Sequence, residues 1–180
     1  MRIKKENSVA VIIDIQERLF PFIYDNQKLS ANTVKLIQGL KTIGLEILVT
    51  EQYTKGLGPT IKDVRDALGT TESIEKISFS CCGDNKFLET IRSIGKKNVI
   101  IAGIESHVCV LQTVIDLIDA GYQPVVIEDC VSSRKLNDKL IAVERMRKAE
   151  AIISTYESIL FEILEVSGTE AFKAISKIVK

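Results

Sequence analysis

The sequence predicts an α/β fold, a doubly wound, mostly parallel sheet of six strands with helices on both faces. Apolar runs alternate with amphipathic segments along almost the whole chain. The run at residues 8–14 is apolar without period-two alternation, which indicates a strand buried on both faces. Two of the amphipathic segments end at glycines, Gly44 and Gly95, as helices commonly do. Strand and helix alternation of this kind gives a parallel sheet between two helical layers, a Rossmann-like three-layer arrangement.

The elements follow one another with short connections. We predict strands at residues 8–14, 45–50, 74–77, from 99, 124–128 and 151–154. We predict helices at residues 30–43, 61–68, 84–95, 109–121, 137–148, 156–164 and 169–179, and a loop at 56–59. No internal repeat, low-complexity tract or linker interrupts the pattern, so we expect residues 1–180 to form a single domain.

Composition excludes several classes of function. Basic and acidic residues balance at 24 each without a dense basic block, which disfavours nucleic-acid and anionic-membrane binding. No apolar run has the length of a membrane span, and no apolar signal region follows Met1, so we expect a cytoplasmic protein. The four cysteines contain no Cys-x-x-Cys pair and the chain has one histidine, which disfavours structural zinc and a thioredoxin-like motif. We expect no disulfide, metal or other cofactor.

The most informative segment is residues 98–110. Its apolar run stops at Gly103, a short polar turn follows, and Cys109 opens an amphipathic segment that ends at Gly121. This pattern predicts a thiol at the N-terminal end of a helix, just beyond the carboxyl end of a buried strand. Free backbone N–H groups and the helix dipole favour an anion there, so we expect the Cys109 thiolate to form easily.

Asp14 is predicted to share a crevice with Cys109. In the strand order 3-2-1-4-5-6, the first and fourth strands are neighbours at the switch point, where ligands bind beyond the carboxyl ends of the strands. A carboxylate there could accept the thiol proton, and a nearby lysine would hold the resulting charge. Lys76, on the predicted edge strand, is a candidate by position, although spacing alone does not choose it among the lysines.

Five segments in this order and spacing resemble a known family. They are residues 11–16, 49–60, 75–80, 103–109 and 128–134. Over nearly its whole length the chain resembles the isochorismatase-like cysteine hydrolases. The resemblance implies an Asp14–Lys76–Cys109 triad and a non-proline cis peptide between Ile104 and Glu105. It also implies an oxyanion hole from the backbone N–H groups of Glu105 and Cys109, and a homodimer or higher homo-oligomer.

The resulting hypothesis is hydrolysis of a small amide through a thioester on Cys109. Asp14 would take the thiol proton and return it to the leaving amine, and water would then cleave the thioester. Nicotinamidases of this family carry a metal site built from an aspartate and histidines after the second strand. Here that region, residues 51–56, contains no histidine, which disfavours metal-dependent nicotinamide hydrolysis. The Glu-Gln-Tyr loop resembles a branch of the family whose substrates are poorly defined.

Each candidate residue also has a structural alternative. Asp14 could bind loop N–H groups, and Lys76 could guard an edge strand. His107 lies two positions from Cys109, about 200° around a helix, so it more naturally lines the turn. Cys130, Cys81 and Cys82 read as small buried hydrophobes, with the latter pair also candidates for a pocket rim. The predicted substrate pocket, whose members could equally be packed side chains, consists of Gln16, Phe20, Tyr53 and Phe79.

Three other functions remain open at this stage. A non-catalytic binding module could keep the fold and the triad without turnover. Vinyl ether hydrolysis, as of isochorismate, needs no nucleophilic thiol, and the presence of Cys109 favours the covalent route instead. A thiol-based redox enzyme would need a resolving cysteine close to Cys109.

Overall fold

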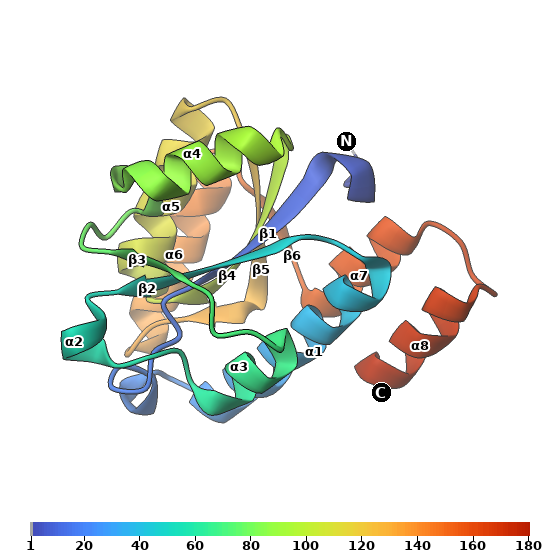
Figure 1. Cartoon of the computed structure of the whole chain (residues 1–180), viewed down its shortest axis with the longest axis horizontal. Helices are drawn as coiled ribbons and strands as arrows, with labels where there is room; N and C mark the ends of the chain where they lie inside the picture. The colour runs from blue at the N-terminus through green and yellow to red at the C-terminus, as the bar shows by residue number, and fades with distance from the viewer. Residues whose placement is uncertain (1) are drawn as a thin grey trace.

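The computed structural model describes residues 2–180 and contains one sheet of six parallel strands (Figure 1). The strand order is β3-β2-β1-β4-β5-β6, which confirms the predicted topology. Every pair of neighbouring strands is parallel. The strands are β1 (Ser8–Ile13), β2 (Ile47–Gln52), β3 (Ile74–Lys76), β4 (Asn98–Ile104), β5 (Gln123–Ser132) and β6 (Ile152–Ser154).

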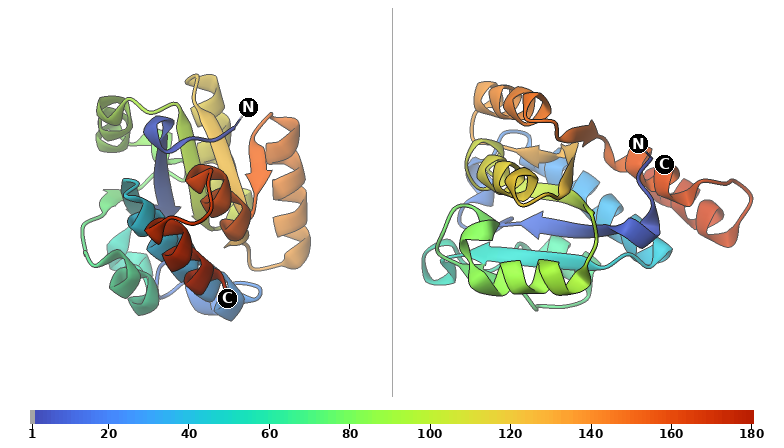
Figure 2. Two further views of the ribbon diagram at one scale, coloured as in Figure 1. Left: turned by 90° about the vertical axis from the view of Figure 1, so that its right-hand side faces the viewer. Right: turned by 90° about the horizontal axis from the view of Figure 1, so that it is seen from above.

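Helices cover both faces of the sheet (Figures 1 and 2). Side chains of β1 alternate between two buried apolar clusters. Ala10 and Ile12 pack with α1, α3, α7 and α8, whereas Val9, Val11 and Ile13 pack with α4, α5 and α6. None of the helices within residues 2–180 is long and apolar enough to span a membrane. The α-helices are α1 (Asn26–Ile43), α2 (Thr54–Leu57), α3 (Lys62–Leu68), α4 (Asn85–Ile94), α5 (Leu111–Asp119), α6 (Leu136–Lys148), α7 (Tyr156–Leu164) and α8 (Glu170–Val179).

Four short helical turns complete the chain. They are the 3-10 turns η1 (Lys5–Asn7), η2 (Phe20–Phe22) and η3 (Cys81–Gly83), and the π-helical turn η4 (Ser106–Val110). Several predicted boundaries are wrong. β2 begins and ends two residues later than expected, and α2 occupies part of the predicted loop at 56–59. α1 begins at Asn26 instead of residue 30, because most of its first turn is exposed and leaves no apolar periodicity to read. β5 continues to Ser132, because its last residues resume pairing with β4 after a register shift.

Gly103 allows β4 to approach β1 closely, at the point where both strands reach the candidate site. Its φ is 142°, and a Cβ built there would lie 2.2 Å from the carbonyl oxygen of Ile13. Any side chain at this position would therefore push β4 away from β1. Asp14 follows directly after Ile13, so the same contact sets the distance between Asp14 and the turn that carries Cys109.

We expect Gly103→Ala to lower the free energy of unfolding by at least about 3 kcal/mol, since overpacking and a positive φ each destabilise an alanine. Gly121→Ala is the matched control, because Gly121 also has a positive φ but nothing lies within 4 Å of its Cβ position. Chemical denaturation of both variants separates the clash from the backbone preference. Equal losses in the two variants would contradict the packing argument.

Candidate active site

Asp14 and Lys76 form a buried ion pair at the carboxyl edge of the sheet. The Nζ of Lys76 lies 2.6 Å from Oδ2 of Asp14, and both side chains are almost completely excluded from solvent. Asp14 follows β1 and has a φ of 52°, which is uncommon for a residue other than glycine. Lys76 ends β3, two strands away in the sheet. The sheet thus brings together two charges that are far apart in the sequence.

The ammonium group of Lys76 has a partner for each of its three hydrogens. Besides Asp14, it donates to the carbonyl oxygens of Ser78, at 3.1 Å, and Phe79, at 3.0 Å. Burial opposes the charge, but the Asp14 carboxylate favours it through its own charge and its hydrogen bond, and the pKa of Lys76 is raised. Lys76 therefore stays charged. The alternative of a solvent-facing edge guard is wrong, because Lys76 is only 1% exposed.

Cys109 lies in the π-helical turn η4, immediately before α5, and its side chain is buried. Burial raises the pKa of the Cys109 thiol well above its usual range, the charge of Asp14 raises it further, and Lys76 only partly opposes these effects. The expectation of an easily formed thiolate is therefore wrong for the resting protein. The thiol is neutral, and its sulfur lies 3.4 Å from Oε1 of Gln52.

The peptide bond between Ile104 and Glu105 is cis, at the position where the resemblance placed one. The Glu105 carbonyl accepts from the backbone of Val108 and Val110, which shapes the turn before Cys109. The Glu105 carboxylate is anchored by Arg134, whose Nε lies 2.9 Å away.

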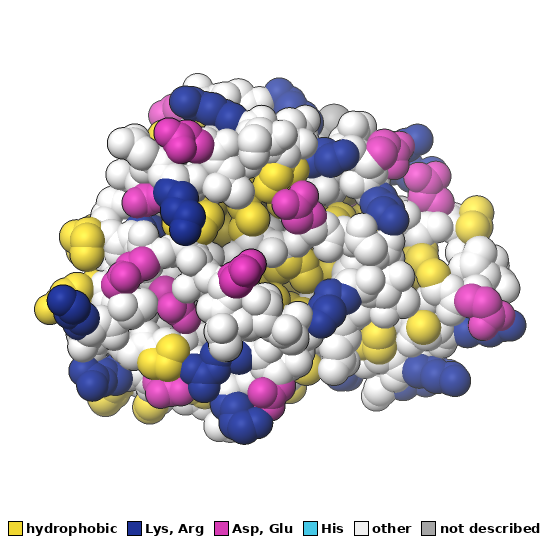
Figure 3. All heavy atoms as spheres, viewed as in Figure 1, with side chains coloured by type: hydrophobic (Ala, Val, Ile, Leu, Met, Phe, Trp, Pro, Cys, Tyr) yellow, Lys and Arg dark blue, Asp and Glu magenta, His cyan; other side chains and the backbone are white. Residues whose placement is uncertain are grey.

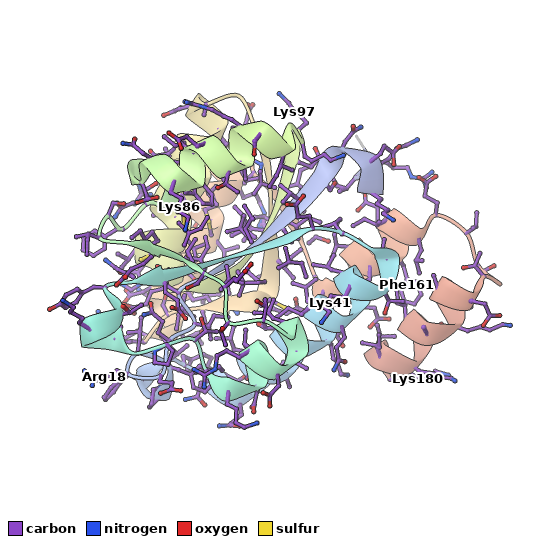
Figure 4. All side chains as sticks on the ribbon, in the orientation of Figure 1. Arg18, Lys41, Lys86, Lys97, Phe161 and Lys180 are labelled. Carbon is purple, nitrogen blue, oxygen red and sulfur yellow. The ribbon has the colours of Figure 1, made fainter. Side chains whose placement is uncertain are left out.

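The loop after β2 is held by buried polar side chains. Oε1 of Glu51 accepts from the backbone and hydroxyl of Thr60, and Oε2 accepts from the hydroxyl of Ser73. Arg18 donates to the carbonyl oxygens of Lys55 and Gly56, and Figure 4 shows it beside α2. Both carboxylate oxygens of Glu51 are therefore occupied by the loop itself. Among residues 2–180, no group of three or more histidine, cysteine, aspartate or glutamate side chains is placed to hold a metal ion.

The four predicted pocket residues fall into different environments. Gln16 is fully buried. Its amide oxygen accepts from the backbone N–H of Gln52, and its amide nitrogen donates to the carbonyl oxygens of Gln52 and Gly58. Phe20 packs partly against the apolar cluster around α1. Tyr53 and Phe79 are about half exposed, at 52% and 53%. Gln16 thus fixes the ends of β1 and β2, while Tyr53 and Phe79 expose aromatic surface on segments whose backbone contacts Lys76.

Sequence reasoning missed three polar residues around the triad. Gln52 contacts the thiol of Cys109, and the hydroxyl of Thr50 donates to Oδ1 of Asp14 at 2.7 Å. The hydroxyl of Thr113 accepts from the backbone N–H of Cys81 and donates to the carbonyl of Cys109. Thr50 and Gln52 alternate along β2 at its carboxyl end, beside β1. Their position at the end of a strand was the available sequence signal, but polar residues are common there and the position does not indicate a role.

The remaining candidates behave as the structural alternatives expected. Nδ1 of His107 lies 2.9 Å from the hydroxyl of Ser133, so His107 lines the turn. Cys130 and Cys81 are completely buried, which removes Cys81 from any pocket rim, while Cys82 is partly exposed. All four cysteines are free thiols.

The chain matches one protein family over most of its length. The model of the isochorismatase domain matches residues 8–158. Isochorismatase family protein 1B of Dictyostelium discoideum is 36% identical over 184 residues, which cover 99% of this chain and 89% of that protein.

Two solved structures share the fold. The MAR1 ribonuclease of Caenorhabditis elegans has a TM-score of 0.92 and 34% identity, covering 99% of this chain and 92% of that one. The YcaC gene product of Escherichia coli, an octameric hydrolase of unknown specificity, has a TM-score of 0.92 and 21% identity, covering 99% and 89%. On the family match and the Dictyostelium relative, the chain belongs to the isochorismatase family of hydrolases.

Proposed function

We propose that residues 1–180 act as one cysteine hydrolase domain that cleaves a small amide through a thioester on Cys109. The observation that carries the proposal is the buried Asp14–Lys76 ion pair beside a neutral thiol. A fully buried charge pair is costly unless its geometry is excellent, and perturbed titratable groups of this kind concentrate at functional sites. Asp14, Lys76 and Cys109 are the proposed catalytic residues.

The first step is proton transfer coupled to attack. Because the resting thiol is neutral, the Cys109 proton moves to Asp14 as the sulfur bonds the substrate carbonyl carbon. Lys76 remains an ammonium throughout, since its three N–H groups stay hydrogen-bonded to Asp14 and to two carbonyl oxygens. It stabilises first the carboxylate of Asp14 and then the negative charge that develops as the sulfur of Cys109 attacks.

The second step is collapse of the tetrahedral oxyanion. The backbone N–H groups of Glu105 and Cys109 receive the oxyanion, and a donor of this kind contributes roughly 3–4 kcal/mol to lowering the barrier. Asp14 returns its proton to the leaving amine, which departs and leaves the acyl thioester. Water then gives a proton to Asp14 and attacks the thioester, releasing the acid and the free thiol.

The substrate is proposed to be small. Tyr53 and Phe79 contribute half-exposed aromatic surface, and Phe20 is partly exposed. These side chains suit an apolar or planar group attached to the amide, with no cofactor involved. Gln16 joins the end of β1 to the end of β2 and to the following loop through its bonds to Gln52 and Gly58.

A panel of small amides tests the proposal. We expect at least one amide to release its amine and to leave an acyl group on the Cys109 peptide, detected by mass spectrometry. Cys109→Ser, which keeps the size and polarity of the side chain, should show neither product. Amide hydrolysis that persists in Cys109→Ser without an acyl adduct would reject the covalent route. Turnover absent from the parent across a broad panel would favour a binding module.

A second candidate is ribonuclease activity, because the similar Caenorhabditis elegans structure is described as a ribonuclease. The surface gives this candidate little support. Lysine and arginine are interspersed with acidic side chains on the face seen in Figure 3, and the formal net charge is zero. Incubating the protein with single-stranded RNA discriminates the two, and RNA cleavage that is lost in Cys109→Ser would favour the second candidate.

We also propose that the protein is a homo-oligomer that works in the cytoplasm. Leu136, Leu140 and Ile141 of α6 are between 41% and 51% exposed, an apolar helix face that a second copy could cover. The similar Escherichia coli hydrolase is an octamer. Four free thiols are compatible with a reducing compartment. Light scattering should give a mass above that of one chain.

A further inference from the structure

The candidate site contains a buried thiol and a buried hydroxyl that the proposed reaction does not use. Cys81 and Thr50 are completely excluded from solvent. The sulfur of Cys81 lies 3.8 Å from Oγ1 of Thr50, and that oxygen lies 2.7 Å from Oδ1 of Asp14. The thiol, the hydroxyl and the carboxylate form a chain of hydrogen bonds, which leads from the connection between β3 and α4 to the ion pair.

The chemistry of the three groups determines which one donates each hydrogen bond of this chain. An ionised carboxylate only accepts, so the single hydroxyl proton of Thr50 must point at Asp14. Thr50 can then only accept from Cys81, which makes the thiol the donor. Burial raises the pKa of the Cys81 thiol to about 12, so that proton stays in place across the physiological range. Cys81 therefore prevents the Thr50 hydroxyl from turning away from Asp14.

Backbone hydrogen bonds fix both ends of this chain, at Asp14 and at Cys81. The carbonyl of Thr50 accepts from the backbone N–H of Asp14 at 3.2 Å. The backbone N–H of Cys81 donates at 2.9 Å to the hydroxyl of Thr113, which itself donates to the carbonyl of Cys109 at 2.7 Å. The segment that carries Cys81 is thus tied to the turn that carries the nucleophile.

We propose that Thr50 is a positioning residue that determines the pH at which Asp14 can accept a proton, and that Cys81 fixes the direction of the Thr50 hydroxyl. Oδ1 of Asp14 receives Thr50 and Oδ2 receives Lys76, so the two oxygens are held by different partners. A hydrogen bond to the charged form of a carboxylate favours that form. Lys76, Cys81 and Cys109 are the titratable groups that face Asp14, from β3, η3 and η4.

Thr50→Val removes the hydroxyl and keeps the branched shape of the side chain. A hydrogen bond to a charged group contributes about 1.5–3 kcal/mol, which corresponds to a shift of about one to two pH units. Because the lost donor favoured the charged form, proton uptake by Asp14 should move to higher pH by that amount. Thr50→Ser restores the hydroxyl and should restore the parent behaviour. Cys81→Ala should produce a smaller shift in the same direction.

Carbon-13 NMR of aspartate-labelled protein measures the effect directly, with Asp14→Asn identifying the Asp14 carboxyl resonance. Thr60→Val is the matched control, because Thr60 is also buried and donates at 2.7 Å to a carboxylate, that of Glu51, outside the triad. The expected result is a shifted Asp14 titration in Thr50→Val, restored in Thr50→Ser and absent in Thr60→Val. A titration in Thr50→Val that superimposes on that of the parent would overturn the inference.

The inference rests on the proposed role of Asp14, and a second readout separates the two claims. The acidic limb of p-nitrophenyl acetate hydrolysis should move to higher pH in Thr50→Val, with KM unchanged. If Cys109→Ser hydrolyses this ester as fast as the parent, the proposed function fails, while the NMR titration still decides the role of Thr50. If Cys109→Ser is inactive and the limb does not move in Thr50→Val, only the inference fails.

Discussion

Asp14→Asn should lower amide turnover by about 10³- to 10⁴-fold, at the upper end of what a general acid–base group contributes. Asparagine has nearly the same shape but a single oxygen, so it can accept from Lys76 or from Thr50 and not from both. It cannot take the Cys109 proton or return one to the leaving amine. Because the same carboxylate is proposed to act in acylation and in thioester hydrolysis, both steps should slow.

Asp129→Asn is the matched control for this measurement. Asp129 is a half-buried carboxylate on β5 that accepts from the backbone N–H of Tyr156, outside the ion pair. Its replacement should leave turnover within a few-fold of the parent. Steady-state kinetics on an amide found in the panel, with circular dichroism to verify folding, gives the comparison. A loss of less than tenfold in Asp14→Asn would remove the proposed base from the mechanism.

Lys76→Met should lower the free energy of unfolding by about 3–5 kcal/mol, because it leaves the carboxylate of Asp14 buried without its counter-ion. For a chain of this size the melting temperature should fall by roughly 10 °C. The ammonium also bonds two carbonyl oxygens, those of Ser78 and Phe79, so the segment after β3 should loosen as well.

The double variant Asp14→Asn with Lys76→Met should recover most of that stability, since removing both charges ends the unpaired burial. Lys62→Met is the exposed control. Lys62 pairs with Asp66 at the surface, where solvent screens the ion pair, so its loss should change the free energy of unfolding little. Because Asp14 raises the Lys76 pKa, the contribution of the ion pair is complete below the unfolded lysine value of about 10.4 and is lost as the pH rises through the higher folded value. A double variant as unstable as Lys76→Met would contradict the argument.

The topology could be predicted from the sequence because it follows from simple periodicities. Uniformly apolar strands separated by amphipathic helices allow few arrangements, and right-handed crossovers reduce these to the order observed. That order alone makes β1 and β4 neighbours and brings Asp14 near Cys109. The family resemblance supplied what periodicity cannot, the choice of Lys76 among the lysines and the place of the cis peptide.

The electrostatic state of Cys109 could not be predicted in the same way. The argument from the helix terminus considered only the dipole, whereas the folded chain also buries the thiol and places it near the Asp14 carboxylate. Those two effects come from β1, β2 and the turn before α5 meeting in space. The contacts of Gln52, Thr50 and Thr113 depend on the same meeting. Their residue types are too common at strand ends and on helices to predict such contacts from sequence.

Asp14, Lys76 and Cys109 are proposed to form one electrostatic unit, and the alkylation rate of Cys109 by iodoacetamide near neutral pH tests this most directly. The carboxylate raises the pKa of the thiol and the ammonium opposes that effect. Asp14→Asn lacks the base that takes the Cys109 proton during attack, and Lys76→Met lacks the ammonium that opposes the raised pKa of the thiol, so both should be alkylated more slowly than the parent. Cys82, whose pKa is raised to about 11 by burial and by Asp116, is the internal reference and should react at the same rate in all three proteins. Equal Cys109 rates in the parent and both variants would contradict the account.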